Sequence, residues 1–239
     1  MTHAKPDHDA TPAESGRIAP AELAVLMRAE HGDPFAVLGP HQVGERLVLR
    51  ALLPDARAVT VVDAAGAPLA DLARQDDSAL FTGVLPPGTP RTAHRLRVSW
   101  SDGHQSELID PYAFPPLIHE LDVWLLAEGR HHRPYEWLGA HPVVVDGVAG
   151  TRFAVWAPAA HRVSVVGSFN NWDGRRHMMR RRVECGTWEI FIPQVGEGDL
   201  YKFEILGADG QLRLKADPFA FRAEVRPHTA SVVQRLLPG

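Results

Sequence analysis

Three segments of this 239-residue chain occur twice, in the same order and about 100 to 107 residues apart. The paired segments are residues 35–41 and 135–141, 53–62 and 157–166, and 110–114 and 217–221. Solenoid repeats have periods of roughly 20 to 50 residues, so this longer spacing indicates duplicated whole domains. Domains contain roughly 100 to 150 residues, and the chain is therefore expected to fold as two similar ones.

Alternating apolar and polar residues predict short strands in both halves. The predicted strands are residues 46–53, 58–62, 79–84, 94–100, 153–156, 162–166, 187–192, 200–206 and 231–233. Turn sequences such as Pro86-Pro87-Gly88 separate them. Short strands between turns are typical of antiparallel sandwiches. The expected fold class is all-β, with two tandem immunoglobulin-like antiparallel β-sandwiches joined by a short helical linker.

Two short helices are predicted outside the strands. Pro20 suits the first turn of a helix that Gly32 ends, and Gly129 ends a second helix with Leu121 and Trp124 on one face. The expected domains are a disordered tail (1–19), a first β-sandwich (20–117), a helical linker (118–140), a second β-sandwich (141–234), and the truncated start of a connection to a further domain (235–239).

The charge balance argues against nucleic acid as a partner. Lys and Arg number 25 against 29 acidic residues, with a formal net charge of -4, so no basic surface is expected. The arginine-rich segment 175–182 is interpreted as a solvated strand edge, where charge discourages further strand pairing. The acidic pairs Asp76-Asp77 and Glu107-Asp110 are interpreted as solvated turns rather than as acid/base pairs.

Other features favour a soluble cytoplasmic protein without cofactors. The single cysteine, Cys185, has no intrachain disulfide partner, which favours a reducing compartment. No apolar run reaches the roughly 18 residues of a membrane helix, and residues 1–20 lack the apolar core of a secretory signal. The adjacent histidines His131 and His132 have no Cys or carboxylate at ligand spacing, so no metal site is expected.

Several longer motifs point to one family. They are the Leu-Gly-x-His strings at 38–41 and 138–141, Pro-Leu-Ile-His-Glu at 116–120, and segments 150–158, 165–174 and 201–204. Over nearly all of the chain after the tail, these motifs resemble bacterial 1,4-α-glucan (glycogen) branching enzymes. The resemblance implies a branching-enzyme N-terminal module in the first half and a family-48 carbohydrate-binding module in the second.

The resemblance ends before the catalytic domain of that family, an α-amylase-type barrel. Such a barrel needs roughly 250 residues, and the family's carboxylate motifs do not occur in this sequence. We therefore expect no catalytic residues. The expected partners are glycogen or malto-oligosaccharide chains and, in the full-length enzyme, the catalytic barrel. Whether the barrel is lost, cut away or encoded separately stays open.

Glucan recognition needs a flat apolar surface for the C–H face of a glucose ring and polar groups for its hydroxyls. Trp172 stands in a predicted turn beside Asn170 and Asn171, where no helix or strand face requires a large indole. The resemblance implies that Trp172 stacks on sugar and that Lys202 matches the family's lysine. The predicted carbohydrate-binding residues are thus Trp172, Lys202, Asn171 and Asn170. The alternative is that Trp172 only caps the sandwich.

The other tryptophans have simpler interpretations. Trp156 and Trp188 lie within predicted strands and are expected in the core, whereas Trp100 and Trp124 are expected in packing between the modules. Kinase-type glycogen-binding modules carry a second tryptophan after their Tyr-Lys-Phe strand. This chain has Leu212 there, which predicts weaker glucan binding.

Two other functions fit the same motifs. The chain resembles the front of a debranching or trehalose-forming relative, which also has a family-48 module, although the duplicated first module argues against it. It also resembles a regulatory glycogen-binding module that tethers a partner protein. The leading prediction is a region that holds glucan near a branching-enzyme barrel and so raises the local substrate concentration during glycogen biosynthesis.

Overall fold

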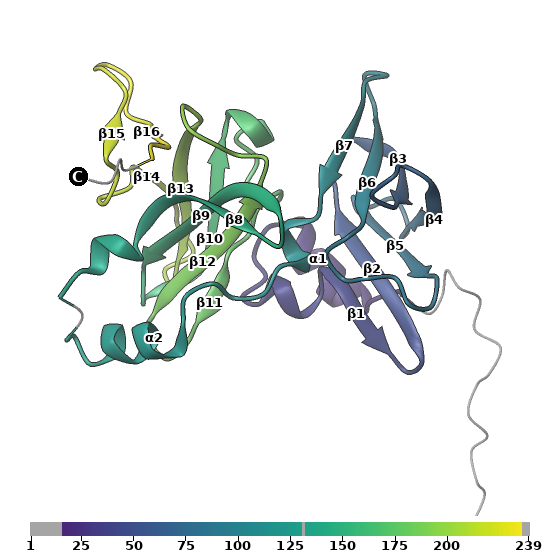
Figure 1. Cartoon of the computed structure of the whole chain (residues 1–239), viewed down its shortest axis with the longest axis horizontal. Helices are drawn as coiled ribbons and strands as arrows, with labels where there is room; N and C mark the ends of the chain where they lie inside the picture. The colour runs from purple at the N-terminus through teal and green to yellow at the C-terminus, as the bar shows by residue number, and fades with distance from the viewer. Residues whose placement is uncertain (1–15, 131, 236–239) are drawn as a thin grey trace, which may run out of the picture.

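The computed structural model describes residues 16–130 and 132–235, which form two β-rich modules placed side by side (Figure 1). Most of the expected tail and of the expected C-terminal connection lies outside these residues. The predicted all-β class is confirmed, since antiparallel strands dominate both modules.

In the first module, seven antiparallel strands form one hydrogen-bonded path in the order β1-β2-β5-β4-β3-β6-β7. Its elements are α1 (Pro20–Met27), η1 (Pro34–Ala36), β1 (Gly39–Val43), β2 (Arg46–Leu52), β3 (Ala56–Val62), β4 (Pro68–Arg74), β5 (Leu80–Leu85), β6 (Arg95–Trp100), β7 (Gln105–Ile109) and η2 (Pro111–Ala113). Strand β4 pairs with both β5 and β3. The strands enclose a core to which Leu49, Val61, Phe81 and Val98 contribute.

The second module consists of two sheets, in the orders β11-β12-β9-β8 and β10-β13-β16-β15, with β14 paired to β13. Its elements are α2 (Glu120–Ala127), η3 (Pro134–Glu136), β8 (Gly139–Val145), β9 (Val148–Trp156), β10 (Ala160–Gly167), η4 (Ser168–Asn170), β11 (Arg180–Arg182), β12 (Thr187–Pro193), β13 (Leu200–Gly207), β14 (Leu212–Lys215), β15 (Arg222–Ala223) and β16 (Ser231–Val232). Phe153, Trp188, Tyr201 and Phe203 fill the core between the sheets.

The sequence repeat is also a repeat of local geometry. His41 and His141 each form a hydrogen bond through Nε2, at 2.9 Å, with the carbonyl of the leucine three residues earlier. Asp110 and Asp217 each accept, through Oδ1, the backbone N–H two residues further on, at 2.9 and 2.8 Å. Equivalent side chains therefore fix equivalent turns in the two modules, as expected after duplication of a whole domain.

Both predicted helices are present, and they too form a pair. The helices α1 and α2 begin 100 residues apart, at Pro20 and Glu120, and each is followed by a 3₁₀ turn and a short strand. From α2 and its flanks, Ile118, Val123 and Leu138 pack with Ala154 and Cys185 of the second module. The segment expected as a linker therefore contains an element that packs on the second module as α1 packs on the first.

The arginine-rich segment differs from the sequence interpretation. Arg180 lies over the Phe35 ring, with its guanidinium carbon 3.9 Å from the ring centroid, and Arg176 lies over Trp100 at 4.9 Å. Phe35 and Trp100 belong to the first module. The interpretation as a solvated edge was wrong for these arginines, because they cross the junction between modules. Contact with Arg176 places Trp100 in inter-module packing, as predicted.

Candidate functional site

The turn that follows β10 carries Trp172 at a fixed place on the surface. After η4 the backbone of Asn171 and Trp172 is left-handed, with φ of 54° and 58°. Asn tolerates this region, whereas a bulky residue seldom adopts it. The backbone N–H of Trp172 donates to the Gly167 carbonyl at 3.0 Å, and the backbone N–H of Asp173 donates to the Asn170 carbonyl at 3.1 Å. These bonds hold the strained conformation and keep the indole at the turn's tip.

Asn170 supports this turn from inside. Its side chain is buried, and its Oδ1 accepts the Gly167 N–H at 2.9 Å. Its Nδ2 donates to the Val165 carbonyl and to His177 Nδ1, both at 2.9 Å. With its amide bonded within the protein, Asn170 does not face a ligand, and the expectation that it contacts sugar does not fit its position. Asn171 is exposed beside it.

Trp172 borders an open hollow of about 450 Å³ on the outer face of the β10–β13–β14 sheet. The indole residue is 41% exposed, and Leu212, which is 56% exposed, lines the same hollow. Strand β14 pairs with β13, with Leu212 opposite Leu206. Position 212 therefore lies on the same face as Trp172, so the hollow has two exposed apolar side chains.

Paired charges form the floor and rim of the hollow. Arg162 Nη1 donates to Glu204 Oε1 at 2.8 Å, and Arg175 Nη2 donates to Asp173 Oδ2 at 2.7 Å. Burial opposes ionisation of Asp173, but the hydrogen bonds and positive charge of Arg175 outweigh it and hold the carboxyl pKa below its usual value. Gly174 leaves room above the Arg162–Glu204 pair, since a Cβ there would meet Glu204 Oε1 and displace that side chain.

Lys202 lies on β13, two residues from Glu204 and hence on the same face of the sheet. Its Nζ donates to Thr229 Oγ1 at 2.8 Å. The residues that line the hollow include Trp172 and Asn171 but not Lys202. The structure thus brings together two of the four predicted site residues and adds Leu212 and Glu204.

Residues 19–112 match the model of the family described as alpha-1,4-glucan branching enzyme GlgB, N-terminal domain. Residues 137–220 match carbohydrate-binding module 48, the isoamylase N-terminal domain. The chain has the N-terminal modules of a glycogen branching enzyme. The hollow at Trp172 lies on the carbohydrate-binding module, beside the branching-enzyme domain.

Solved pullulanase structures are similar over much of the chain. Pullulanase from Anoxybacillus sp. LM18-11 is 17% identical, with a TM-score of 0.34, over 82% of this chain and 27% of that one. PulA from Klebsiella oxytoca is 18% identical, with a TM-score of 0.35, over 82% and 21%. The branching-enzyme modules thus span about a quarter of the length of these proteins.

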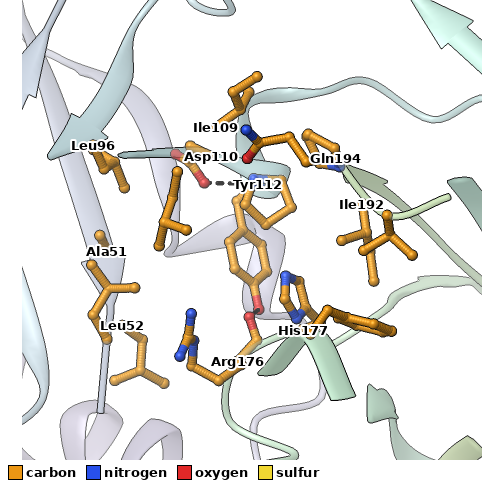
Figure 2. Close-up of a pocket in the computed structure, with 16 residues that line it drawn as sticks. Ala51, Leu52, Leu96, Ile109, Asp110, Tyr112, Arg176, His177, Ile192 and Gln194 are labelled. Carbon is orange, nitrogen blue, oxygen red and sulfur yellow. Dashed lines mark hydrogen bonds between the residues drawn. The ribbon is translucent and has the colours of Figure 1, made fainter. Parts of the chain in front are cut away.

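A second cavity, of about 130 Å³, lies between the branching-enzyme domain and the carbohydrate-binding module (Figure 2). Tyr112 projects into it toward Arg176 and His177, and the Tyr112 hydroxyl accepts the Met178 N–H at 2.9 Å. Asp110 is buried here, where its Oδ1 accepts the Tyr112 N–H, so the interpretation of this aspartate as part of a solvated turn was wrong.

The positions of the remaining tryptophans agree only in part with the sequence prediction. Trp188 is fully buried in the carbohydrate-binding module, as predicted. Trp156 is 61% exposed, because it is the last residue of β9 and points away from the core, so its assignment to the core was wrong. Trp124 lies exposed on α2, a helix that packs on the second module rather than at the junction.

Two negative findings apply to the described parts of the branching-enzyme modules. Residues 16–130 and 132–235 contain no group of three His, Cys, Asp or Glu side chains placed to hold a metal ion. Within the same ranges no helix has the length and apolar character that crossing a membrane requires.

Proposed function

We propose that this chain is the α-glucan-binding and substrate-positioning region of a glycogen branching enzyme, with its glucan site at Trp172. The two family matches support this proposal. In the full-length enzyme, a catalytic barrel would transfer α-1,4-glucan chains to form α-1,6 branches. The modules would hold the chain near that barrel in the cytoplasm and raise its local concentration, without taking part in the chemistry.

The exposed indole on a rigid turn is the observation that carries the proposal. Trp172 keeps 41% of its surface exposed although its backbone is held in a conformation unfavourable for a bulky residue. Strained backbone that surrounding bonds maintain is concentrated at functional sites. A hollow bordered by Trp172 and Leu212 offers apolar surface to the C–H face of a glucose ring, and exposed Asn171 offers a polar group to its hydroxyls.

The fixed turn also favours binding energetically. Ordering a flexible loop on binding costs free energy, and a preorganised surface avoids that cost. Asn170 supplies the preorganisation, because its three hydrogen bonds join Gly167, Val165 and His177 around the turn. Asn170 is therefore assigned to positioning Trp172, in place of direct sugar contact.

The branching-enzyme domain at 19–112 supports this function over its alternatives. A debranching relative or a stand-alone tethering module would share the carbohydrate-binding module, whereas the matched first domain is named for branching enzymes. In this proposal the catalytic barrel is the protein partner, and glycogen or malto-oligosaccharide is the ligand.

Affinity electrophoresis of the full chain in glycogen-containing native gels tests the site. Trp172→Ala is expected to weaken binding about tenfold or more, because it removes buried apolar area and a ring contact worth about 0.5–1.5 kcal/mol. Trp124→Ala is the matched control, since it removes a similarly exposed indole from α2. Equal retardation of wild type and Trp172→Ala would mean that Trp172 does not hold glucan.

A further inference from the structure

The branching-enzyme domain reaches into the hollow of the carbohydrate-binding module. Helix α1 ends at Met27, and the next two residues, Arg28 and Ala29, line the same hollow as Trp172 and Leu212. These two residues come from the first module, about 140 positions earlier in the chain than Trp172. The candidate site therefore has walls from both modules.

Hydrogen bonds fix the end of α1 at this place. The Ala29 carbonyl accepts the Nε–H of buried Arg162, which also binds Glu204 on the floor of the hollow. One residue further on, the Glu30 carbonyl lies 3.0 Å from His161 Nε2. Both partners belong to β10, the strand that leads into the Trp172 turn. Arg28 and Trp172 are thus held relative to one another by a short run of bonds across the junction.

The charged side chains around the hollow differ in how many of their hydrogen-bond donors are already paired within the protein. Arg162 is buried and paired with Glu204, and Arg175 is held by several bonds to Asp173. The Arg28 side chain is 57% exposed, and its Nε donates to Glu30 at 2.8 Å. Within residues 16–130 and 132–235, no partner is found for its two terminal nitrogens.

We propose that Arg28 is a glucan-binding residue and that the site is completed only when the first module is docked on the second. This inference rests on the proposed function of the Trp172 hollow. A guanidinium presents several N–H donors in a rigid plane, which suits neighbouring hydroxyl oxygens of a sugar. With one glucose ring stacked on Trp172, Arg28 donates to hydroxyls of the same chain at the rim formed by the branching-enzyme domain. The α1 end of the first module is thus part of the binding surface.

Calorimetric titration of the full chain with maltoheptaose tests this. Arg28→Ala is expected to weaken binding about three- to tenfold through the loss of charge-assisted hydrogen bonds, with an unchanged melting temperature because the side chain is exposed. Arg57→Ala is the matched control, an exposed arginine on β3 of the same module, and should bind like wild type. Arg28→Lys, which keeps the charge but loses the planar fork, should fall between wild type and Arg28→Ala.

The outcomes separate this inference from the proposed function. If Trp172→Ala loses binding while Arg28→Ala keeps wild-type affinity, the site is confined to the second module and this inference is overturned. If Trp172→Ala keeps wild-type affinity, or the wild type binds no maltoheptaose, the proposed function fails and the composite site falls with it. An equal loss of affinity in Arg28→Ala and Arg57→Ala would mean a non-specific charge effect and would also overturn the assignment.

Discussion

Trp172 and Asn170 lie two residues apart in one turn, but one side chain is exposed and the other is buried. The left-handed backbone of Asn171 and Trp172 reverses the chain, so that Asn170 faces the interior and Trp172 faces solvent. A turn of polar residues around an indole was visible in the sequence. Which asparagine points inward was not, because that depends on two positive φ angles that no residue pattern specifies.

Leu212 and Arg28 show two further limits of sequence reasoning at the site. The Leu212 side chain reaches the hollow because a hairpin joins β13 and β14, and the sequence left the face of position 212 undecided. Arg28 follows a helix in the other module, and nothing local marks it as a neighbour of Trp172. Contacts between distant segments leave no periodic signal, so only the folded chain shows them.

His177 provides a prediction about acid stability. Its imidazole faces the cavity between the modules, and burial first and the positive charge of Arg176 second lower its pKa to about 3. Its Nδ1 accepts from Asn170 Nδ2, which requires a neutral ring. An unfolded chain takes up this proton below about pH 6.5, whereas the folded one does not until about pH 3. This contribution to stability is therefore complete above pH 6.5 and is lost as the pH falls toward 3.

Urea unfolding at pH 7 and pH 5 measures this effect. His177→Asn keeps an acceptor oxygen near the Nδ1 position but does not titrate. From pH 7 to pH 5, wild type should lose up to about 2 kcal/mol more unfolding free energy than His177→Asn, since one pKa unit corresponds to about 1.4 kcal/mol. Other titrating groups affect both proteins alike and cancel in the difference. Parallel losses in the two proteins would show that His177 does not stay neutral in the fold.

At the scale of elements, most of the strands found from the sequence have two neighbours in a sheet, with β10 at a sheet end as the exception. Strands β2, β5, β9 and β12 are flanked on both sides and are mostly buried, so their sequences are rich in apolar residues. Of the missed strands, β1, β7, β8, β11, β14 and β15 lie at sheet edges, where burial is incomplete. The missed strand β4 has two neighbours but buries only Leu72 fully. Because an edge strand buries little of either face, its sequence shows weak alternation, and β1 and β8 also contain proline.

The hairpin of β13 and β14 gives an engineering prediction. Leu212 and Trp172 line one hollow, so Leu212→Trp would add a second indole to the surface that receives the sugar. An aromatic ring offers a larger and flatter surface than leucine, and the gain should be several-fold to about tenfold in affinity. The substitution should not harm folding, because Leu212 is mostly exposed.

Titration of Leu212→Trp with maltoheptaose checks this expectation. Leu214→Trp, on the same short strand, is the comparison variant, since Leu214 is also exposed but is not part of the hollow's wall. Tighter binding only for Leu212→Trp would support the hollow as the sugar site. A folded Leu212→Trp protein with equal or weaker affinity would mean that position 212 does not meet the ligand.

At the scale of the whole molecule, the repeat predicted two modules but not how closely they join. Met178 of the second module is buried in a cluster with Leu23, Leu26 and Leu80 of the first. Phe35 of the first packs against both this cluster and the core of the second. A duplicated sequence shows where each module repeats, whereas it does not show which surfaces of the two modules meet.

Arg180 lies at this junction, and its removal tests whether the modules unfold together. Burial lowers the Arg180 pKa, and its Nη2 donates to the Phe114 carbonyl at 3.1 Å while its guanidinium covers Phe35. Arg180→Met keeps an apolar stem but loses both interactions with the first module. Cation–π contacts and hydrogen bonds of this kind contribute about 1–2 kcal/mol each, so the coupling between modules should fall by a similar amount.

Scanning calorimetry of the full chain measures that coupling. Wild type should unfold in one transition, because Met178 and Phe35 join the two cores. Arg180→Met should broaden or divide the transition as the less stable module begins to unfold alone. Arg181→Met is the matched control: this neighbouring side chain is exposed and contacts Pro158 and Trp188, both within the second module. Identical transitions in the two variants would mean that Arg180 does not hold the modules together, and that the packing of Met178 on α1 and the bonds of Arg162 and His161 suffice to join them.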